Sequence, residues 1–541
     1  MVEFRALRVA RWRAVPVAIW IAVLAALWFA ALAMATPFDH DESQYVAGAH
    51  FAARLTIFRD FLYLQPPIHA WAYAPIAWGF PGHAVMAMRM ATAMTALATL
   101  WLLWRGQRIA GVSRASAMMA VMLVSATAAF QFSASVVRND MLPTMLTAMA
   151  MVAALMALRD GRGRLWLAAG LCLGLAIATK LSFAPVGIAA GLFLVASRRQ
   201  GSVRAAGWVG TGAVVGMVPM LLAWWGAPDG FVHGVLTFGI SAPHAWYAAN
   251  GAAQDLSLAE KGADLIKYLA KGPALVALML IIARCRRMVD APGRRLALWM
   301  IGGAMIGAAL PTPTQVQYLL PLVPPLTLAL GFCLDDVRRV SERSRRIMLG
   351  LLVIASVPGM VEPARDMMAM LRGGSPVVAA ARDARASGAL VRAMAGDGMI
   401  ATLSPHLMID SGLAIDPRFA PGPFVYRTGQ LLSPVEARSL HVMTPATLGD
   451  LDRAPPAAIL TGYERGTRKL PLRPDDGLVG YARSRGYRAV PMRDGVGMLF
   501  VRQFGAGVAL GDPPSNICKG DGQSPPICID APSHFQHFAS P

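Results

Sequence analysis

Residues 17–45 read VAIWIAVLAALWFAALAMATPFDHDESQY, and this stretch decides the class of fold. Its apolar part is long enough to cross a lipid bilayer as a helix. It runs almost directly into three carboxylates, Asp39, Asp41 and Glu42. Charged groups so close to lipid are costly and usually mark a functional site. The stretch therefore predicts a membrane-spanning helix that leads into a chemically active loop.

The whole chain has the composition of a polytopic membrane protein. Charged residues make up 15% of the 541 residues and apolar residues 56%, whereas soluble domains contain about 25% charged residues. This balance excludes a soluble enzyme, a disordered chain and a fibrous protein. The net charge of +19 would indicate nucleic acid binding in a soluble protein. Here arginines in cytoplasmic loops account for it, so no nucleic acid partner is expected.

Breaks in the apolar pattern place about eleven membrane-spanning helices along the sequence. They cover residues 14–35, 84–104, 115–134, 141–158, 165–179, 182–197, 205–225, 264–283, 296–311, 316–334 and 347–362. The first is too long, and too poorly followed by a small-residue cleavage site, to be a removable signal peptide.

Arginines collect in alternate loops between these spans, which sets the orientation. The basic segments hold Arg5, Arg8, Arg11 and Arg13; Arg105, Arg108 and Arg114; Arg159, Arg162 and Arg164; Arg198, Arg199 and Arg204; Arg284, Arg286, Arg287, Arg294 and Arg295; and Arg338, Arg339, Arg343, Arg345 and Arg346. Positively charged loops stay in the cytoplasm. We therefore expect a multi-pass protein of the cytoplasmic (inner) membrane with a cytoplasmic N-terminus and an extracytoplasmic region after residue 362.

This topology divides the chain into three parts. Residues 1–362 form the membrane domain, with a first outer loop at 36–83. Residues 363–505 mix a helix-like stretch with short apolar runs, which predicts a small extracytoplasmic α/β domain. We expect this domain to be a folded cap over the membrane part. The tail 506–541 is rich in Gly, Pro and Ser and is expected to be disordered. Its Cys518 and Cys528 are expected to form a disulfide, with two free thiols as the alternative.

The first outer loop holds the most informative residues. A helix from Asp41 to Arg54 would place Asp41 and Tyr45 on one face. The alternative is that Asp39 or Asp41 only caps this helix. Three carboxylates beside His40 favour a functional role. The following segment, residues 66–80, is too short and proline-rich to span and is expected to lie at the membrane interface, where it could border a groove for a lipid substrate.

Further outer-face residues could complete a site. Asp140 and Arg138 lie between the third and fourth spans, where Asp140 could instead cap the next helix. Lys180 lies at a hinge between two spans and either snorkels or offsets a phosphate. Asp41, Asp140 and His244 could hold a divalent ion such as Mg²⁺ or Mn²⁺. No HExxH or Cys-rich motif is present, so the signal for a metal ion is weak, and no other cofactor is expected.

Together these residues resemble a known family. The pattern runs from Asp41-Glu42 and Tyr45 through the Pro66–Trp71 segment, Arg89, Asp140 and Thr179-Lys180 to Gln317–Pro321. Its order and sidedness are similar to those of membrane-embedded glycosyltransferases with the GT-C fold, such as lipid A aminoarabinose transferases and protein O-mannosyltransferases. The resemblance covers about residues 14–335.

The sequence departs from this family at one place. Aminoarabinose transferases carry Glu-Lys before the double proline, where this chain has Leu64-Gln65. Any metal or phosphate role of that pair would then have to be taken over by Arg89, Arg138 or Lys180.

The resemblance implies transfer of a sugar, with inversion, from a polyprenyl-phosphate-linked donor to an envelope acceptor on the outer face. Asp41 matches the catalytic acidic residue of the family and Asp140 its second loop acid. We expect Asp41 to act as the base, with Glu42 and Asp140 orienting it or holding a divalent ion. The expected substrate-binding residues are Tyr45, His69, Arg89, Arg138, Lys180, Gln317 and Tyr318.

Two other classes of function remain open. A transporter or flippase of lipid-linked sugars would have about as many spans. The clustering of the acids at one face and the lack of evident inverted halves weigh against it. A non-catalytic binding or scaffold protein is the third possibility.

Overall fold

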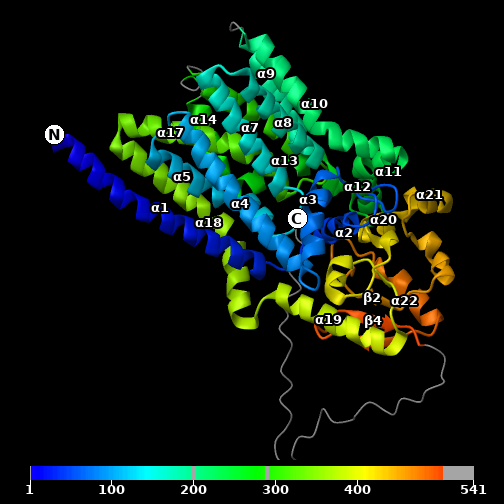
Figure 1. Cartoon of the computed structure of the whole chain (residues 1–541). Helices are drawn as coiled ribbons and strands as arrows, with labels where there is room; N and C mark the ends of the chain where they lie inside the picture. The colour runs from blue at the N-terminus through cyan, green and yellow to red at the C-terminus, as the bar shows by residue number, and fades with distance from the viewer. Residues whose placement is uncertain (1, 198–200, 285, 287–290, 504–541) are drawn as a thin grey trace, which may run out of the picture.

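The computed structural model describes residues 2–197, 201–284, 286 and 291–503. Figure 1 shows a bundle of long helices with a smaller domain of helices and strands against one end. The predicted membrane protein with a small α/β domain is confirmed. Arg198, Arg199, Cys285, Arg287 and the 506–541 tail, with its Cys518–Cys528 pair, lie outside the described residues.

Each predicted span coincides with a helix or with a bent pair of helices. Among the described residues, five helices are long and apolar enough to cross a membrane, or seven if each of two bent pairs is one span. Three further apolar helices are shorter, so the count of eleven stays a prediction. The helices of this part are α1 (Val2–Ala35), α4 (Ala84–Ile109), α5 (Arg114–Ser125), α6 (Ala128–Ser135), α7 (Met141–Asp160), α8 (Gly163–Thr179), α9 (Ala184–Ala196), α10 (Ser202–Gly226), α13 (Leu258–Ala270), α14 (Ala274–Ala283), α16 (Pro292–Ala309), α17 (Val323–Val340) and α18 (Glu342–Gly373).

Two predicted spans are broken, and the breaks contact each other. The axis bends by 71° between α5 and α6 and by 94° between α13 and α14. At the breaks, the N–H of Ala128 donates to the carbonyl oxygen of Lys271 at 2.9 Å. A broken helix at membrane depth needs partners for its free backbone groups. The hydrogen bond between Ala128 and Lys271 supplies such a partner from one bend to the other.

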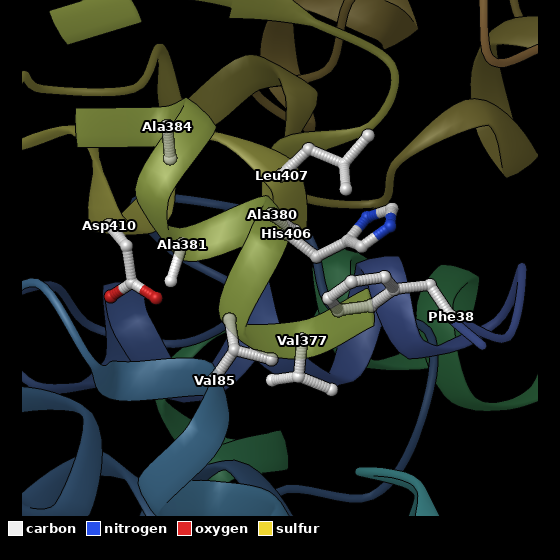
Figure 2. Close-up of a pocket in the computed structure, with 9 residues that line it drawn as sticks. All are labelled: Phe38, Val85, Val377, Ala380, Ala381, Ala384, His406, Leu407 and Asp410. Carbon is white, nitrogen blue, oxygen red and sulfur yellow. The ribbon is translucent and has the colours of Figure 1, made fainter. Parts of the chain in front are cut away.

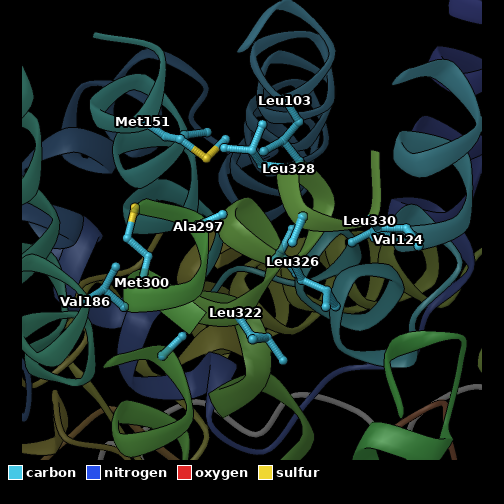
Figure 3. Packing of buried hydrophobic residues seen from close by; sticks show 14 of the residues in the cluster. Leu103, Val124, Met151, Val186, Ala297, Met300, Leu322, Leu326, Leu328 and Leu330 are labelled. Atoms are coloured by element: carbon cyan, nitrogen blue, oxygen red, sulfur yellow. The ribbon is translucent and has the colours of Figure 1, made fainter. Parts of the chain in front are cut away.

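Helix α17 forms the centre of the bundle. Its apolar window, which begins in the short helix η4 (Val316–Leu322), is 89% buried. A helix that is apolar all round belongs in a core. Figure 3 shows Leu326, Leu328 and Leu330 of α17 among side chains from α4, α5 and α7.

Helices α8 and α10 pack through glycines. A Cβ on Gly170 or Gly174 would overlap backbone carbonyl oxygens of α10, and one on Gly212 or Gly216 would overlap those of α8. Small residues four positions apart let membrane helices approach closely, so backbone contact itself forms this interface.

The C-terminal domain contains a four-stranded sheet in the order β1-β2-β4-β3. Its strands are β1 (Ile400–Thr402), β2 (Ala458–Thr461), β3 (Arg488–Pro491) and β4 (Met498–Val501). β1 and β2 are parallel, and the other two pairs are antiparallel. The strands β1, β2 and β4 coincide with predicted apolar runs. The helices of the domain are α19 (Pro376–Ala395), α20 (Pro423–Arg427), α21 (Pro434–Ser439) and α22 (Asp475–Ser484).

This domain packs directly on the first outer loop, which contains α2 (Glu42–Ala52) and α3 (Ile68–Gly79). One apolar cluster joins buried residues of α2 and α3 to Val391 of α19 and Leu460 of β2. The Asp410 carboxylate accepts the N–H of Ala84 at 2.8 Å and thereby satisfies the start of α4. Figure 2 shows residues of α19 facing Val85, with Phe38 beside His406. The domain is therefore part of one packed unit with the loop.

Candidate active site

A fully buried ion pair fixes the start of the site. Glu42 begins α2, and its carboxylate accepts from Arg89 of α4 at 2.7 and 2.5 Å. The Glu42 carboxylate also accepts the N–H of Val137 at 2.9 Å. The other guanidinium N–H groups donate to carbonyl oxygens at the end of α1, those of Ala33, Thr36 and Pro37. Arg89 thus joins α1, α2 and α4, which gives it a positioning role; its predicted contact with substrate stays a prediction.

Arg138 is the centre of the acidic cluster. It lies between α6 and α7, and its guanidinium donates to Asp39, to Asp41 at 2.8 Å and to Asp140 at 3.1 Å. The same guanidinium lies 5.5 Å from the ring centroid of Tyr45. Residues about a hundred positions apart in the sequence therefore meet around one cation, and Asp41 and Tyr45 share a face of α2 as predicted.

The capping alternative is wrong for both Asp41 and Asp140. Each occupies the N-cap position of the following helix, α2 or α7, but neither side chain makes a capping hydrogen bond. Both carboxylates instead turn to Arg138.

Lys180 and Tyr318 continue the cluster on its far side. The Lys180 ammonium binds Asp140 and lies 4.9 Å from the ring centroid of Tyr318. Gln65 accepts a hydrogen bond at 3.0 Å from Asn139, the neighbour of Arg138. Gln317 is buried in η4. The structure thus brings together most of the predicted site residues, namely Asp41, Glu42, Tyr45, Arg89, Arg138, Asp140, Lys180 and Tyr318.

His69 is buried against aromatic rings. It stacks on Tyr73 at 4.4 Å and meets the edge of Tyr45 at 5.5 Å. Neither ring nitrogen has a partner among the described residues. Burial lowers the pKa of His69 to about 3, so the imidazole is neutral and keeps both nitrogens available to a ligand.

The two accessible carboxylates differ in their protonation. The side chain of Asp41 is 33% exposed and that of Asp39 is 22% exposed, whereas Asp140 is buried. Burial raises the pKa of Asp41, but the Arg138 guanidinium and His40 outweigh burial and hold this pKa well below its usual range. Burial dominates at Asp39 and raises its pKa, despite Arg138. Asp41 is therefore an ionised, accessible carboxylate.

The predicted metal ligands Asp41, Asp140 and His244 are not assembled. Within the described ranges, no three His, Cys, Asp or Glu side chains come together as metal ligands. Arg138 instead bridges the two aspartates. These residues do not fit a resident metal ion in this arrangement, and the metal requirement stays a prediction.

The C-terminal domain adds residues that sequence reasoning missed. Glu464, which closely follows β2, binds the imidazole of His40 at 2.9 Å, and Phe424 of α20 meets the same ring at 4.9 Å. Arg427 lies 4.6 Å from the ring centroid of the same Phe424. The one available signal was the position of Glu464 in a loop after a strand, where functional residues are common.

The chain is a polytopic membrane protein with a fold of the GT-C type. Residues 64–225 match the family described as dolichyl-phosphate-mannose-protein mannosyltransferase. A search of curated proteins finds no significant match.

The chain also resembles solved structures of ArnT, a lipid A aminoarabinose transferase, from Cupriavidus metallidurans. The apo structure superposes with a TM-score of 0.58 at 16% sequence identity, covering 90% of this chain and 97% of that one. The structure bound to undecaprenyl phosphate gives the same TM-score and coverage at 17% identity. The resemblance to GT-C enzymes noted in the sequence is confirmed at the level of the fold.

Proposed function

We propose that this protein is an inverting glycosyltransferase of the cytoplasmic membrane. It moves a sugar from a polyprenyl-phosphate-linked donor to an envelope acceptor on the outer face. The observation that carries the proposal is the Asp41 carboxylate, one-third exposed and ionised, held by Arg138 beside Lys180. The match to a mannosyltransferase family and the undecaprenyl phosphate bound to a protein of the same fold support the lipid-linked donor.

The proposed reaction is a single displacement. The acceptor hydroxyl oxygen attacks the anomeric carbon while the bond from that carbon to the phosphate oxygen breaks. The phosphate leaves with the electron pair, and the hydroxyl proton passes to Asp41. One displacement inverts the anomeric carbon. Because the phosphate is already a good leaving group, the enzyme needs a base and positive charge more than a strong acid.

Each residue of the cluster has a part in this scheme. Arg138 orients Asp41, and Asp140 orients Arg138 and Lys180. Asp41 is ionised at physiological pH and so can accept a proton, although its lowered pKa makes it a weak base. Asp39 is a second candidate base because its raised pKa makes it the more basic carboxylate, although it is less exposed.

The substrates would be identified first. Lipid-linked sugars and envelope glycans are compared by mass between cells with and without this gene. Transfer by the purified protein then separates the enzyme from the transporter, since a flippase would move the lipid-linked sugar without cleaving it. A purified protein that moves the donor across vesicles and leaves it intact would exclude this proposal.

Asp41→Asn tests the base. The amide cannot take the proton, and loss of a positioned base costs about 10²–10⁴-fold in rate. We expect Asp41→Asn to remain folded and to retain less than about a hundredth of the transfer rate, and Asp39→Asn, at the competing candidate base, to lose less activity than Asp41→Asn. Retention of more than about a tenth by Asp41→Asn, with a larger loss in Asp39→Asn, would assign the base to Asp39.

A further inference from the structure

Aminoarabinose transferases have a lysine before the double proline, and this chain has Gln65 there. The cations expected to replace that lysine are all paired with carboxylates. Arg89 binds Glu42, Arg138 binds three aspartates, and Lys180 binds Asp140. A cation already neutralised by carboxylates offers little net charge to a phosphate. The charge for a substrate phosphate must therefore have another source.

Arg427, the last residue of α20, is a cation of a different kind. Its guanidinium lies between two aromatic rings, 4.6 Å from the centroid of Phe424 and 5.0 Å from that of Trp246 in α12 (Phe238–Ala249). No carboxylate of the described chain forms an ion pair with it. Its Nε is buried and has no hydrogen-bond partner. The stacking holds the planar fork in place while its donors stay unused.

The indole N–H of Trp246 also lacks a hydrogen-bond acceptor. Its Nε1 is buried and finds no acceptor among the described residues. Arg427 and Trp246 come from distant parts of the chain, and both can only donate. A buried donor without an acceptor is costly, and native proteins rarely leave two side by side. The pair therefore calls for an acceptor-rich ligand.

The position of the pair connects it to the proposed chemistry. The ring of Phe424 contacts both Arg427, at 4.6 Å, and His40, at 4.9 Å, and His40 lies 3.7 Å from the Asp41 carboxylate. Glu464 is paired with His40, and Asp41 with Arg138. Because each of these carboxylates already has a cation of its own, Arg427 stays available to an anion beside the acidic cluster.

We propose that Arg427 and Trp246 form a subsite for a phosphate group of a lipid substrate. The subsite rests on the proposed function and gives the C-terminal domain a direct part in substrate binding. A guanidinium fork and an indole N–H match the oxygens of a phosphate, which is the planar, multidentate recognition that arginine performs best. The phosphate can belong to the polyprenyl donor or to a phosphorylated acceptor lipid.

Binding to the purified full-length chain tests the subsite without any sugar transfer. The probes are undecaprenyl phosphate, diphosphorylated lipid A in vesicles, and undecaprenol, which lacks the phosphate. A hydrogen bond to a charged group corresponds to about a tenfold to hundredfold change in affinity. We expect Arg427→Ala to weaken binding of a phosphorylated lipid by at least about tenfold and to leave undecaprenol binding unchanged.

Matched variants separate binding from folding. Arg427→Lys keeps the charge and should recover part of the affinity. Trp246→Phe keeps an aromatic ring beside Arg427 but removes the pyrrole ring with its N–H. Arg453→Ala, at a residue 76% exposed on the same domain, should bind like the wild type.

Weaker binding of undecaprenyl phosphate assigns the subsite to the donor, and weaker binding of lipid A alone assigns it to the acceptor. Unchanged binding of both lipids in Arg427→Ala and Trp246→Phe would overturn the subsite. A wild type that binds phosphorylated lipid in this way but never transfers sugar would reject the proposed function and leave the subsite in place.

Discussion

At the scale of single residues, the site is organised by charges that almost cancel. Three carboxylates, Asp39, Asp41 and Asp140, face two cations, Arg138 and Lys180. One negative charge therefore remains, and it is consistent with the raised pKa of Asp39. A cluster in this balance holds the loop together, and in the proposed reaction its remaining negative charge would attract the proton of the acceptor hydroxyl.

The Glu42–Arg89 pair is the first residue-scale prediction. Glu42→Gln should strongly destabilise the protein because it leaves the buried guanidinium of Arg89 without a counter-charge. Breaking such a pair costs about 3–5 kcal/mol. Arg59→Ala is the control, because Arg59 is 63% exposed and its pair with Asp60 should contribute less than about 1 kcal/mol. Thermal unfolding in detergent measures both, and equal losses of stability would contradict the positioning role.

At the scale of elements, the interface of α8 with α10 depends on the absence of side chains. Gly212 faces the backbone of α8, where a Cβ would overlap the carbonyl oxygen of Leu167, whereas a Cβ on Gly210 would meet nothing. Two glycines of one helix therefore provide a matched pair of substitutions.

Gly212→Val should force α8 and α10 apart and lower the yield of folded protein, while Gly210→Val should not. Overpacking of a close interface typically costs about 1–3 kcal/mol. Fluorescence-detected size-exclusion chromatography after mild heating gives the fraction that remains monodisperse. If both variants keep the wild-type fraction, the helices do not approach as closely as described.

The bent helices show where sequence reasoning stops at this scale. Residues 115–134 and 264–283 read as uninterrupted apolar spans, and apolar periodicity carries no information on where an axis bends. The bends are stabilised by each other, through the hydrogen bond from Ala128 to Lys271. Such a contact between distant residues is invisible to a local pattern.

At the scale of the whole molecule, His40 and Glu464 connect the first outer loop to the last domain. Burial disfavours the charged imidazolium, but the Glu464 carboxylate outweighs burial and raises the pKa of His40. A raised histidine pKa means that the stabilisation is complete below the unfolded value of about 6.5 and is lost as the pH rises through the folded value.

Glu464→Gln should therefore lower the thermal midpoint most at about pH 6, and the difference from wild type should shrink toward about pH 10. Because the ring of His40 is 42% exposed, the pair contributes at most about 1 kcal/mol. Thermal unfolding of both proteins across this range measures the effect. A difference that stays constant with pH would show that the pair is not ionic.

The orientation of the molecule gives a second prediction at this scale. In a chain whose native cysteines are replaced by serine, Ser484→Cys should react with an impermeant thiol reagent added outside intact cells. Ser344→Cys should react only after the membrane is opened. Both positions are exposed in the structure, so accessibility is matched. Labelling of the Ser344 position from outside would overturn the orientation read from the arginines.

Much of this architecture could be predicted from the sequence because its signals are local. Apolar runs marked the helices, and charges beside lipid marked Asp41, Asp140 and Lys180. The edge strand β3 was missed because its residues are largely exposed and lack an apolar run. Arg427 was missed because only the fold brings it to Trp246. Nothing near either residue in the sequence distinguishes it from an ordinary surface arginine or a core tryptophan.

The packing of the C-terminal domain on the first outer loop also sets an order in time. A ribosome makes the acidic loop among its earliest products, and the strands and loops that cover it among its latest. His40 therefore lacks its partner until Glu464 has been made. The first residues of the site to be synthesised are therefore the last to gain their partners. A chain that stops short of β2 would have an uncovered acidic cluster and an incomplete candidate site.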